Sequence, residues 1–266
     1  MRFPLSRIAF TCFALSMFFG QLSADSCSYW CQGPLPPSSV RIGVYGGIVP
    51  SYYSHRSDNL FIGPDGIGGI VGEDDSPGFR DQFNLPWTIG LDVGYADTDS
   101  SEVFFSITYA KATGKDFHFN VDDIHGEFKF KSYSDLGLWI GYRYHFVGAD
   151  SCGCYFDPFI GFKVGAKFLS KVKADYHSHQ FSFSEHGLTY FQKETVPAMG
   201  LQLGFSFNFI DCIDMVLMGE AIWAGQFRAN NKIYLGGNAG DIQAISVGHT
   251  GPVWTFPVTL GFVMSL

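Results

Sequence analysis

The stretch LGLWIGYRYHF, residues 136–146, alternates large apolar side chains with small or polar ones. Successive side chains of a β-strand point to opposite faces of the sheet. A period of two therefore predicts a strand with one apolar face and one mixed face that carries most of the polar groups. The two sets are Leu136, Leu138, Ile140, Tyr142, Tyr144 and Phe146 on the apolar face, and Gly137, Trp139, Gly141, Arg143 and His145 on the other.

Seven further stretches show the same alternation, at 40–48, 87–95, 103–110, 160–168, 199–209, 217–227 and 258–266. The stretch 217–227 is the weakest, because Gly219 and Ala221 fall on its apolar face. The connections are alternately long (50–85, 111–134, 170–195, 228–252) and short (96–101, 148–157, 210–214). This alternation is typical of up-and-down barrels that carry long loops on one rim. We predict an all-β fold, an eight-stranded antiparallel up-and-down transmembrane β-barrel over residues 40–266.

Five charged residues lie on the polar faces of these strands: Asp92, Arg143, Lys163, Lys167 and Glu220. A charge that faced hydrocarbon would cost about 2–4 kcal/mol near the membrane midplane. A soluble β-sandwich is the alternative, but a core of Gly, Ser, Lys and Asp would bury too little apolar area to fold. We therefore expect the apolar face to meet lipid and the five charges to point into the lumen. There they serve as packing or as a selectivity filter, and packing is favoured because side chains just fill the interior of an eight-stranded barrel.

The composition supports strands over helices. Aromatic residues make up 17% of the 266 residues, and the chain contains 32 Gly, both poor helix formers. The formal net charge is −8. An acidic chain without basic clusters in its sequence argues against a nucleic-acid partner. It also argues against adhesion to anionic lipid through a general electrostatic patch.

The first 24 residues have the features of a signal peptide: a basic start at Arg2 and Arg7, an apolar run at 8–19, and a small residue, Ala24, at the expected cleavage point. The run is too short to span a bilayer as a helix. A buried N-terminal helix is the alternative. We expect residues 25–39 to form a periplasmic N-terminal tail that carries Cys27 and Cys31, and we expect both barrel termini to face the periplasm.

Alternation continues beyond the membrane-length part of two neighbouring strands. It runs through Phe117 and Phe119, and again through Phe128 and Phe130, with the same parity as the apolar faces below. This predicts a hairpin that extends well above the bilayer. Pro197 and Pro257 lack a ladder donor, and we expect both at strand starts.

Taken together, the pattern resembles the small OmpA/OmpX-type outer-membrane barrels over about residues 40–266. The resemblance implies an integral outer-membrane location. Full OmpA-type proteins carry a peptidoglycan-binding domain after the barrel, and in this respect we expect the chain to differ from them. The last strand, with Val258, Leu260, Phe262, Met264 and Leu266, is similar to the family's assembly signal, although that signal usually ends in Phe or Trp.

Five cysteines follow the expected cleavage point: Cys27, Cys31, Cys152, Cys154 and Cys212. The predicted topology places all five on the periplasmic side, where disulfides form. Two interpretations stay open. Local pairs such as Cys27–Cys31 would leave a spare thiol, or the cysteines would cross-link to other envelope proteins. The second arrangement resembles the Cys-rich outer-membrane proteins of chlamydia-type bacteria.

Other side chains give weaker indications of a site. His177 and His179 stand on one side of an extended segment, which suits a metal site, but surface histidines without a role are commoner. Catalysis would need a Ser and a His in hydrogen-bond reach, and His55, Ser57 and Asp58 offer these residue types only within a long Gly-rich loop. We expect no enzymatic activity and no cofactor.

The sequence favours a structural or surface-interaction role, namely envelope integrity or adhesion through extracellular loops. The alternative is a narrow porin-like channel for ions or small solutes. The expected partners are outer-membrane lipid, disulfide-linked envelope proteins, and a host or surface ligand.

Overall fold

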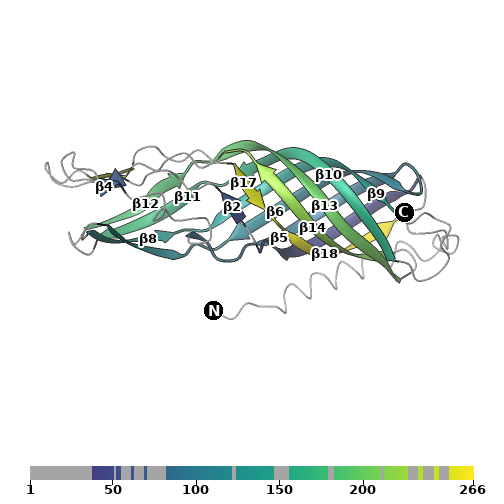
Figure 1. Cartoon of the computed structure of the whole chain (residues 1–266), viewed down its shortest axis with the longest axis horizontal. Helices are drawn as coiled ribbons and strands as arrows, with labels where there is room; N and C mark the ends of the chain where they lie inside the picture. The colour runs from purple at the N-terminus through teal and green to yellow at the C-terminus, as the bar shows by residue number, and fades with distance from the viewer. Residues whose placement is uncertain are drawn as a thin grey trace.

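Eight antiparallel strands form a closed barrel in the computed structural model of this chain (Figure 1). The structure describes residues 38–50, 52–54, 61–62, 69–70, 82–121, 124–146, 156–178, 183–210, 213–226, 233–235, 243–245 and 252–266. Each barrel strand pairs with the barrel strands before and after it, and β1 closes the barrel by pairing with β18. The eight are β1 (Val40–Ile48), β5 (Trp87–Ala96), β6 (Ser101–Ala112), β9 (Tyr133–His145), β10 (Phe156–Leu169), β13 (Glu194–Ile210), β14 (Ile213–Ala224) and β18 (Val258–Ser265).

All eight predicted strands are confirmed, and the weakest is shifted in position. The seventh strand was predicted at 217–227, but β14 covers Ile213–Ala224. Its outward face begins with Ile213, Met215 and Leu217, and Val216, Met218 and Ile222 point into the barrel. Because apolar residues occupy both faces of β14, its alternation was hard to read from the sequence.

The barrel is apolar outside and polar inside. Large apolar side chains are exposed on its outer surface, for example Ile140, Leu201 and Leu203 at 57%, 62% and 64% exposure. No described helix has both the length and the apolar character needed to cross a bilayer. The inward glycines make room for inward aromatic rings: a Cβ on Gly141 would lie 2.4 Å from Cζ of Phe104, and a Cβ on Gly204 would lie 2.5 Å from Cζ of Phe159.

The two ends of the barrel differ. Short connections join β5 to β6, β9 to β10 and β13 to β14 at one end, which we call the turn end. Long connections lie at the other, the loop end. Pro257 directly precedes β18, as predicted. Pro197 lies inside β13 and not at its start. Its carbonyl accepts the N–H of Gly225 at 3.0 Å, but proline has no N–H for the reciprocal bond, and the ladder with β14 begins at the next residue, Ala198.

A second sheet projects beyond the loop end (Figure 1). Its strand order is β12-β11-β8-β7, and its strands are β7 (Asp116–Val121), β8 (Ile124–Phe130), β11 (Val172–Ser178) and β12 (Phe183–Phe191). The extended β7–β8 hairpin is confirmed. The β11–β12 hairpin lies within residues 170–195, which were predicted to be a long connection. We call these four strands the projecting sheet.

Six shorter strands complete the described part of the chain. β17 pairs with β14 and with β2, so it extends the barrel wall above β18. β3 pairs with β4, and β15 pairs with β16. Their bounds are β2 (Tyr52–Ser54), β3 (Phe61–Ile62), β4 (Gly69–Ile70), β15 (Ile233–Leu235), β16 (Gln243–Ile245) and β17 (Val253–Thr255).

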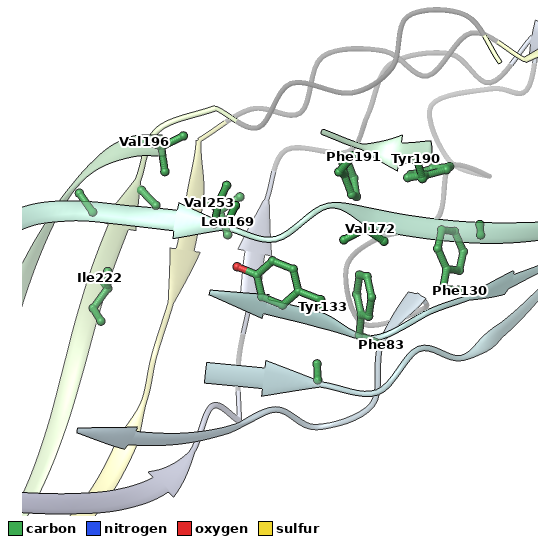
Figure 2. Close-up of a cluster of buried hydrophobic side chains, with 14 of the residues drawn as sticks. Phe83, Phe130, Tyr133, Leu169, Val172, Tyr190, Phe191, Val196, Ile222 and Val253 are labelled. Carbon is green, nitrogen blue, oxygen red and sulfur yellow. The ribbon is translucent and has the colours of Figure 1, made fainter. Parts of the chain in front are cut away.

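An apolar cluster joins the loop end of the barrel to the projecting sheet (Figure 2). Parity along the chain suggested that Phe128 and Phe130 continue the outer face of the barrel. Instead they are 1% and 5% exposed and lie in this cluster. Outward residues of β9 are even-numbered, so the inward turn of these rings requires a change of facing between β8 and β9, at residues 131–132. The cluster comprises Phe83, Ala112, Phe128, Phe130, Tyr133, Trp139, Leu169, Val172, Ala174, Tyr176, Tyr190, Phe191, Val196, Ala198, Ile222, Ala224 and Val253.

The fit between glycines and lumen rings predicts a contrast between two glycines. Gly141→Val should destabilise the barrel by about 1–3 kcal/mol through overpacking, because the Phe104 ring already occupies the space. Gly46 faces outward, and a Cβ there would meet no atom within 4 Å, so Gly46→Val is the matched control. Urea unfolding of the refolded proteins measures the difference. Equal loss in both variants would contradict the lumen-filling role of Gly141.

Candidate functional site

The most distinctive polar arrangement of this chain is the charged network inside the barrel. All five predicted lumen charges, Asp92, Arg143, Lys163, Lys167 and Glu220, are inward-facing and 2–9% exposed. Asp92, Arg143, Lys163 and Glu220 belong to one connected set of contacts, whereas Lys167 pairs separately. We call the connected set the lumen network: Arg41, Asp92, Glu102, Arg143, His145, Asp157, Lys163, Gln202, Asp214 and Glu220.

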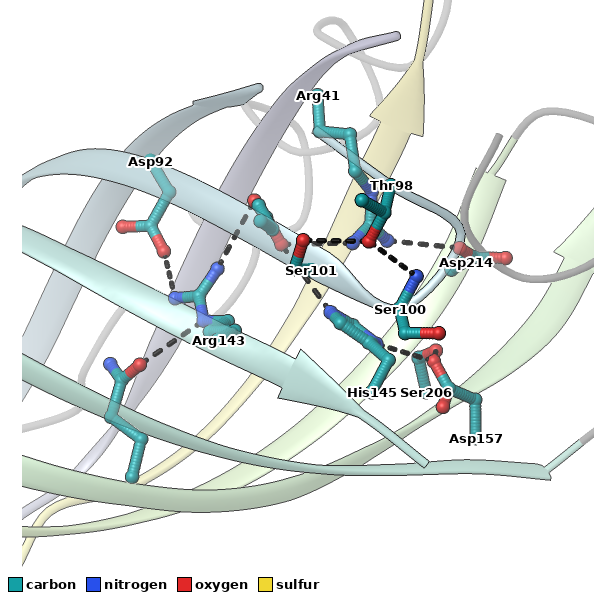
Figure 3. A network of polar contacts seen from close by, with 12 residues as sticks. Arg41, Asp92, Thr98, Ser100, Ser101, Arg143, His145, Asp157, Ser206 and Asp214 are labelled. Carbon is teal, nitrogen blue, oxygen red and sulfur yellow. Dashed lines mark hydrogen bonds and ion pairs between the residues drawn. The ribbon is translucent and has the colours of Figure 1, made fainter. Parts of the chain in front are cut away.

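Arg143 on β9 is the centre of the network. Its Nη2 donates to Asp92 of β5, its Nη1 lies 3.6 Å from Glu102 of β6, and its Nε donates to Gln202 of β13 at 3.1 Å (Figure 3). Its guanidinium carbon also lies 3.9 Å from the centroid of the Phe104 ring. One side chain thus links four strands of the barrel, through two charge-assisted hydrogen bonds and one ion pair.

Toward the turn end, Glu102 connects Arg143 to a second group of charges. Arg41 on β1 lies 3.0 Å from Glu102 and 3.2 Å from Asp214 on β14. His145 lies between two carboxylates, with Nδ1 2.5 Å from Asp157 and Nε2 3.5 Å from Glu102 (Figure 3). This part of the network joins side chains from β1, β6, β9, β10 and β14.

Toward the loop end, the network continues through Gln202 on β13. Its amide donates to Glu220 at 2.5 Å, and Lys163 donates to the same carboxylate oxygen at 2.6 Å. The Lys163 ammonium lies 4.6 Å from the centroid of the Trp139 ring. Nearer the loop end, Lys167 forms a separate ion pair with Asp135 at 3.3 Å, and the Tyr133 hydroxyl donates to Asp135 at 2.7 Å.

Sequence reasoning missed six lumen charges: Arg41, Glu102, Asp135, His145, Asp157 and Asp214. Arg41 and His145 were on the polar faces but were not singled out. The other four lie beyond the predicted strand limits, because β6, β9, β10 and β14 begin earlier than the apolar alternation suggested. Extending the period of two by a few residues past each strand start would have found them.

Carboxylates outnumber fixed cations in the lumen network. Asp92, Glu102, Asp157, Asp214 and Glu220 face Arg41, Arg143 and Lys163, and His145 can supply a further positive charge. Each of these side chains is at most 7% exposed. Buried charges of this kind are retained only when they are paired. The arrangement therefore cross-links the strands.

Aromatic and apolar groups fill the remaining lumen. The inward rings Tyr45, Phe104, Phe159 and Trp139 are 1–5% exposed. Above them the apolar cluster occupies the loop end (Figure 2). The described lumen thus contains charged pairs and rings at the turn end and an apolar cluster at the loop end.

Several predicted site residues lie outside the described residues. These are Cys27, Cys31, Cys152, Cys154 and Cys212, His179, and the set His55, Ser57 and Asp58, together with the predicted signal peptide. His177 is described on β11, where Nδ1 lies 2.5 Å from the Ser184 hydroxyl. Among the described side chains, no group of three or more His, Cys, Asp or Glu is arranged to hold a metal ion.

The outward face of the projecting sheet is polar. Asp175 on β11 accepts a hydrogen bond from Lys131 and another, at 2.8 Å, from the backbone N–H of Gly187, which has a positive φ of 71°. The Lys131 hydrogen bond, assisted by that of Gly187, holds the pKa of Asp175 below its ordinary 3.8. On the next row, His118 lies 3.6 Å from Glu127. These contacts join β7 to β8, and they join β11 to β12 and to Lys131, which directly follows β8, on the solvent side.

No protein-family model matches the sequence, and no curated protein matches it. Solved structures with a similar arrangement include the outer membrane protein OprG from Pseudomonas aeruginosa, at 15% identity and a TM-score of 0.45, covering 88% of this chain and 98% of that one. The outer membrane protease OmpT from Escherichia coli has 9% identity and a TM-score of 0.47, with coverage of 88% and 98%. Neisserial surface protein A has 8% identity and a TM-score of 0.39, with coverage of 85% and 96%. The fold described above rests on the strand pairing of this chain, and similarities of this size add no activity to it.

The Lys163–Glu220 pair gives a test of the lumen network. Lys163→Met leaves a buried carboxylate without its cation and should cost about 3–5 kcal/mol of unfolding free energy. Lys163→Met combined with Glu220→Met removes both charges and should cost less than the single change. Urea unfolding in detergent micelles measures both. A double variant less stable than the single one would show that the two charges are not coupled.

The contacts of Asp175 predict an acid-sensitive hairpin. A lowered folded pKa means that the Asp175 contacts stabilise the sheet fully above the unfolded value of 3.8 and are lost as pH falls through the lowered folded pKa. Hydrogen exchange at the Gly187 amide, corrected for the intrinsic rate, should therefore speed up as the pH falls below that range. Asp175→Asn should give fast exchange at neutral pH already. A pH-independent protection of Gly187 would refute the assignment.

Proposed function

We propose that this protein is an integral outer-membrane barrel whose lumen does not conduct and which displays the projecting sheet as a surface for protein interactions. The observation that carries this proposal is the combination of a cross-linked, filled lumen with a sheet that continues four barrel strands beyond the loop end. Catalysis has no part in the proposal.

The distribution of side chains supports the membrane location. Nearly every large outward side chain of the barrel is apolar, and exposed apolar area of this extent is rare on soluble monomers. Aromatic residues such as Trp87 and Tyr109, whose ring centroids are 5.6 Å apart, lie near the loop end of the apolar surface, as in aromatic belts. By analogy with bacterial barrels, the loop end would face outward and the turn end would face the periplasm.

The alternative, a narrow channel, would need a continuous polar path. Two successive obstructions argue against a channel. The first is the set of paired charges around Arg143, and the second, nearer the loop end, is the apolar cluster with Leu169, Ile222 and Val253. An ion crossing the network would have to break buried pairs, and an ion crossing the cluster would lose its water.

The projecting sheet supports an interaction role because β7 is an edge strand: among the described strands it pairs with β8 alone. The N–H of Phe130 bonds to the carbonyl of Lys115, and the register then continues through Phe117↔Phe128. Hydrogen-bonded and non-bonded pairs alternate in antiparallel ladders. The backbone groups of Asp116, His118 and Asn120 therefore point away from β8, toward an edge that pairs with no other described strand. An extended segment of a partner could add as a further strand there.

Planar-bilayer recording tests the closed lumen. The refolded wild-type protein should give no steady unit conductance. The combined change Arg143→Ala with Phe104→Ala removes only the first obstruction, so this variant should also stay closed, because the apolar cluster remains. Steady wild-type openings that disappear on altering Lys163 or Lys167 would establish the channel instead.

Edge binding has a separate test, in bacteria that display the full chain. His118→Pro removes an N–H that faces the free edge and spares the ladder with β8, so adherence to cultured host cells should fall. His118→Thr also removes the imidazole but keeps the N–H, and it should adhere like the wild type. Equal adherence of all three would refute strand addition and leave the non-conducting barrel in place.

A further inference from the structure

Seven lysines surround the junction between the barrel and the projecting sheet. We call them the lysine collar: Lys111, Lys115, Lys129, Lys131, Lys171, Lys173 and Lys193. Lys111 is half-buried and the other six are exposed. The other described lysines, Lys163 and Lys167, are the lumen pair members. A chain with a formal net charge of −8 thus carries a local basic belt at one level of the molecule.

Strand register brings these scattered residues together. Lys131 and Lys173 face each other across β8 and β11, where the N–H of Lys131 bonds to the carbonyl of Lys173 at 2.8 Å. Lys111 pairs with Ser134, whose carbonyl accepts a hydrogen bond from the N–H of Ser170 at 2.9 Å. Lys171 directly follows Ser170. Lys193 precedes Glu194, which pairs with Leu169, so Lys193 joins the same level.

Four of the seven lysines have no partner among the described carboxylates. Lys129 lies 3.4 Å from Glu127, and Lys131 bonds Asp175. Lys111, Lys171, Lys173 and Lys193 make no ion pair with any described carboxylate. Like charges placed opposite each other, as at Lys131 and Lys173, are unfavourable in a sheet. Anions from outside the chain would relieve that repulsion.

The collar begins where the apolar surface of the barrel ends. The last large apolar outward residues at the loop end are Tyr109 on β6, Leu136 on β9 and Phe168 on β10. The next outward positions are Lys111, Ser134 and Ser170, two residues further and hence about 7 Å along each strand. If hydrocarbon covers the apolar surface, the ammonium groups lie at the level of the lipid head groups.

We infer that the lysine collar binds the phosphate groups of anionic lipid head groups in the leaflet at the loop end. This inference rests on the proposed membrane location. A membrane surface fits better than a soluble polyanion because the collar is continuous with the lipid-facing surface. The sequence argued against an electrostatic lipid patch, since these lysines are spread between positions 111 and 193. The strand register assembles them.

Quenching of tryptophan fluorescence by brominated lipids reports which lipids lie next to the collar, and so tests the inference. Trp87, Trp223 and Trp254 lie on the outward face near the loop end, and Trp139 is buried in the lumen at 1% exposure. The protein, in a Trp30→Phe background, is reconstituted into vesicles of phosphatidylcholine mixed with brominated phosphatidylglycerol or with brominated phosphatidylcholine. The ratio of quenching gives the relative binding constant of the anionic lipid.

The wild type should prefer phosphatidylglycerol by up to about fivefold per engaged lysine, the factor that corresponds to about 1 kcal/mol. The preference should fall severalfold when Lys111, Lys171, Lys173 and Lys193 are all changed to Gln, and it should survive when all four are changed to Arg. It should also fall in 1 M NaCl, where the screening length is about 3 Å. No preference in the wild type, or an equal preference in the Gln variant, would overturn the inference.

A gel-mobility control separates this result from the membrane proposal itself. Folded barrels resist SDS until heated, so all three proteins should migrate differently before and after boiling. If they do and the lipid preference is absent, only the collar inference fails. If none shows the mobility difference and none is quenched by any brominated lipid, both the collar inference and the proposed membrane location fail.

Discussion

Closure of β1 onto β18 is the interaction on which the rest of the structure depends. It turns an eight-stranded sheet into a barrel without edges, so that every wall strand finds backbone partners on both sides. In hydrocarbon, where an unpaired backbone group costs several kcal/mol, only such closure or a helix is tolerated. Closure also fixes which faces exist: one continuous outer surface and one enclosed lumen. The sorting of apolar and polar side chains along each strand follows from that division.

Enclosure imposes a second requirement, because the lumen must be filled and its polar groups must be paired. Arg143 meets both conditions by joining four strands and lying over the Phe104 ring. Glycines such as Gly141 and Gly204 supply the space that the rings need. Replacing a buried ion pair by apolar residues is often neutral for stability. A network of this extent therefore fits a role in specifying register and strand order at least as well as one in adding stability.

The sequence revealed the wall of the barrel better than its contents or its outer sheet. A period of two is local, so it identified all eight strands and the inward position of Asp92, Arg143, Lys163, Lys167 and Glu220. Which charges meet depends on register between strands distant in sequence, and Arg41 and Asp214 could be paired only from the closed structure. The projecting sheet shows the limit of parity: Phe128 and Phe130 keep the outward parity of β9 yet lie inside, because the chain changes facing between β8 and β9. The lysine collar escaped notice for the same reason as the lumen pairs, since no window of sequence contains it.

The continuity of the projecting sheet with the barrel has a mechanical consequence. β7 and β8 prolong β6 and β9, and β11 and β12 prolong β10 and β13. A tensile force on the far end of the sheet would run along the strands into the wall and load the ladders in shear, so that many hydrogen bonds resist together and do not open one at a time. The apolar cluster at the junction would limit bending of the projecting sheet relative to the barrel. The projecting sheet and the barrel wall would therefore carry a pulling force as one mechanical unit.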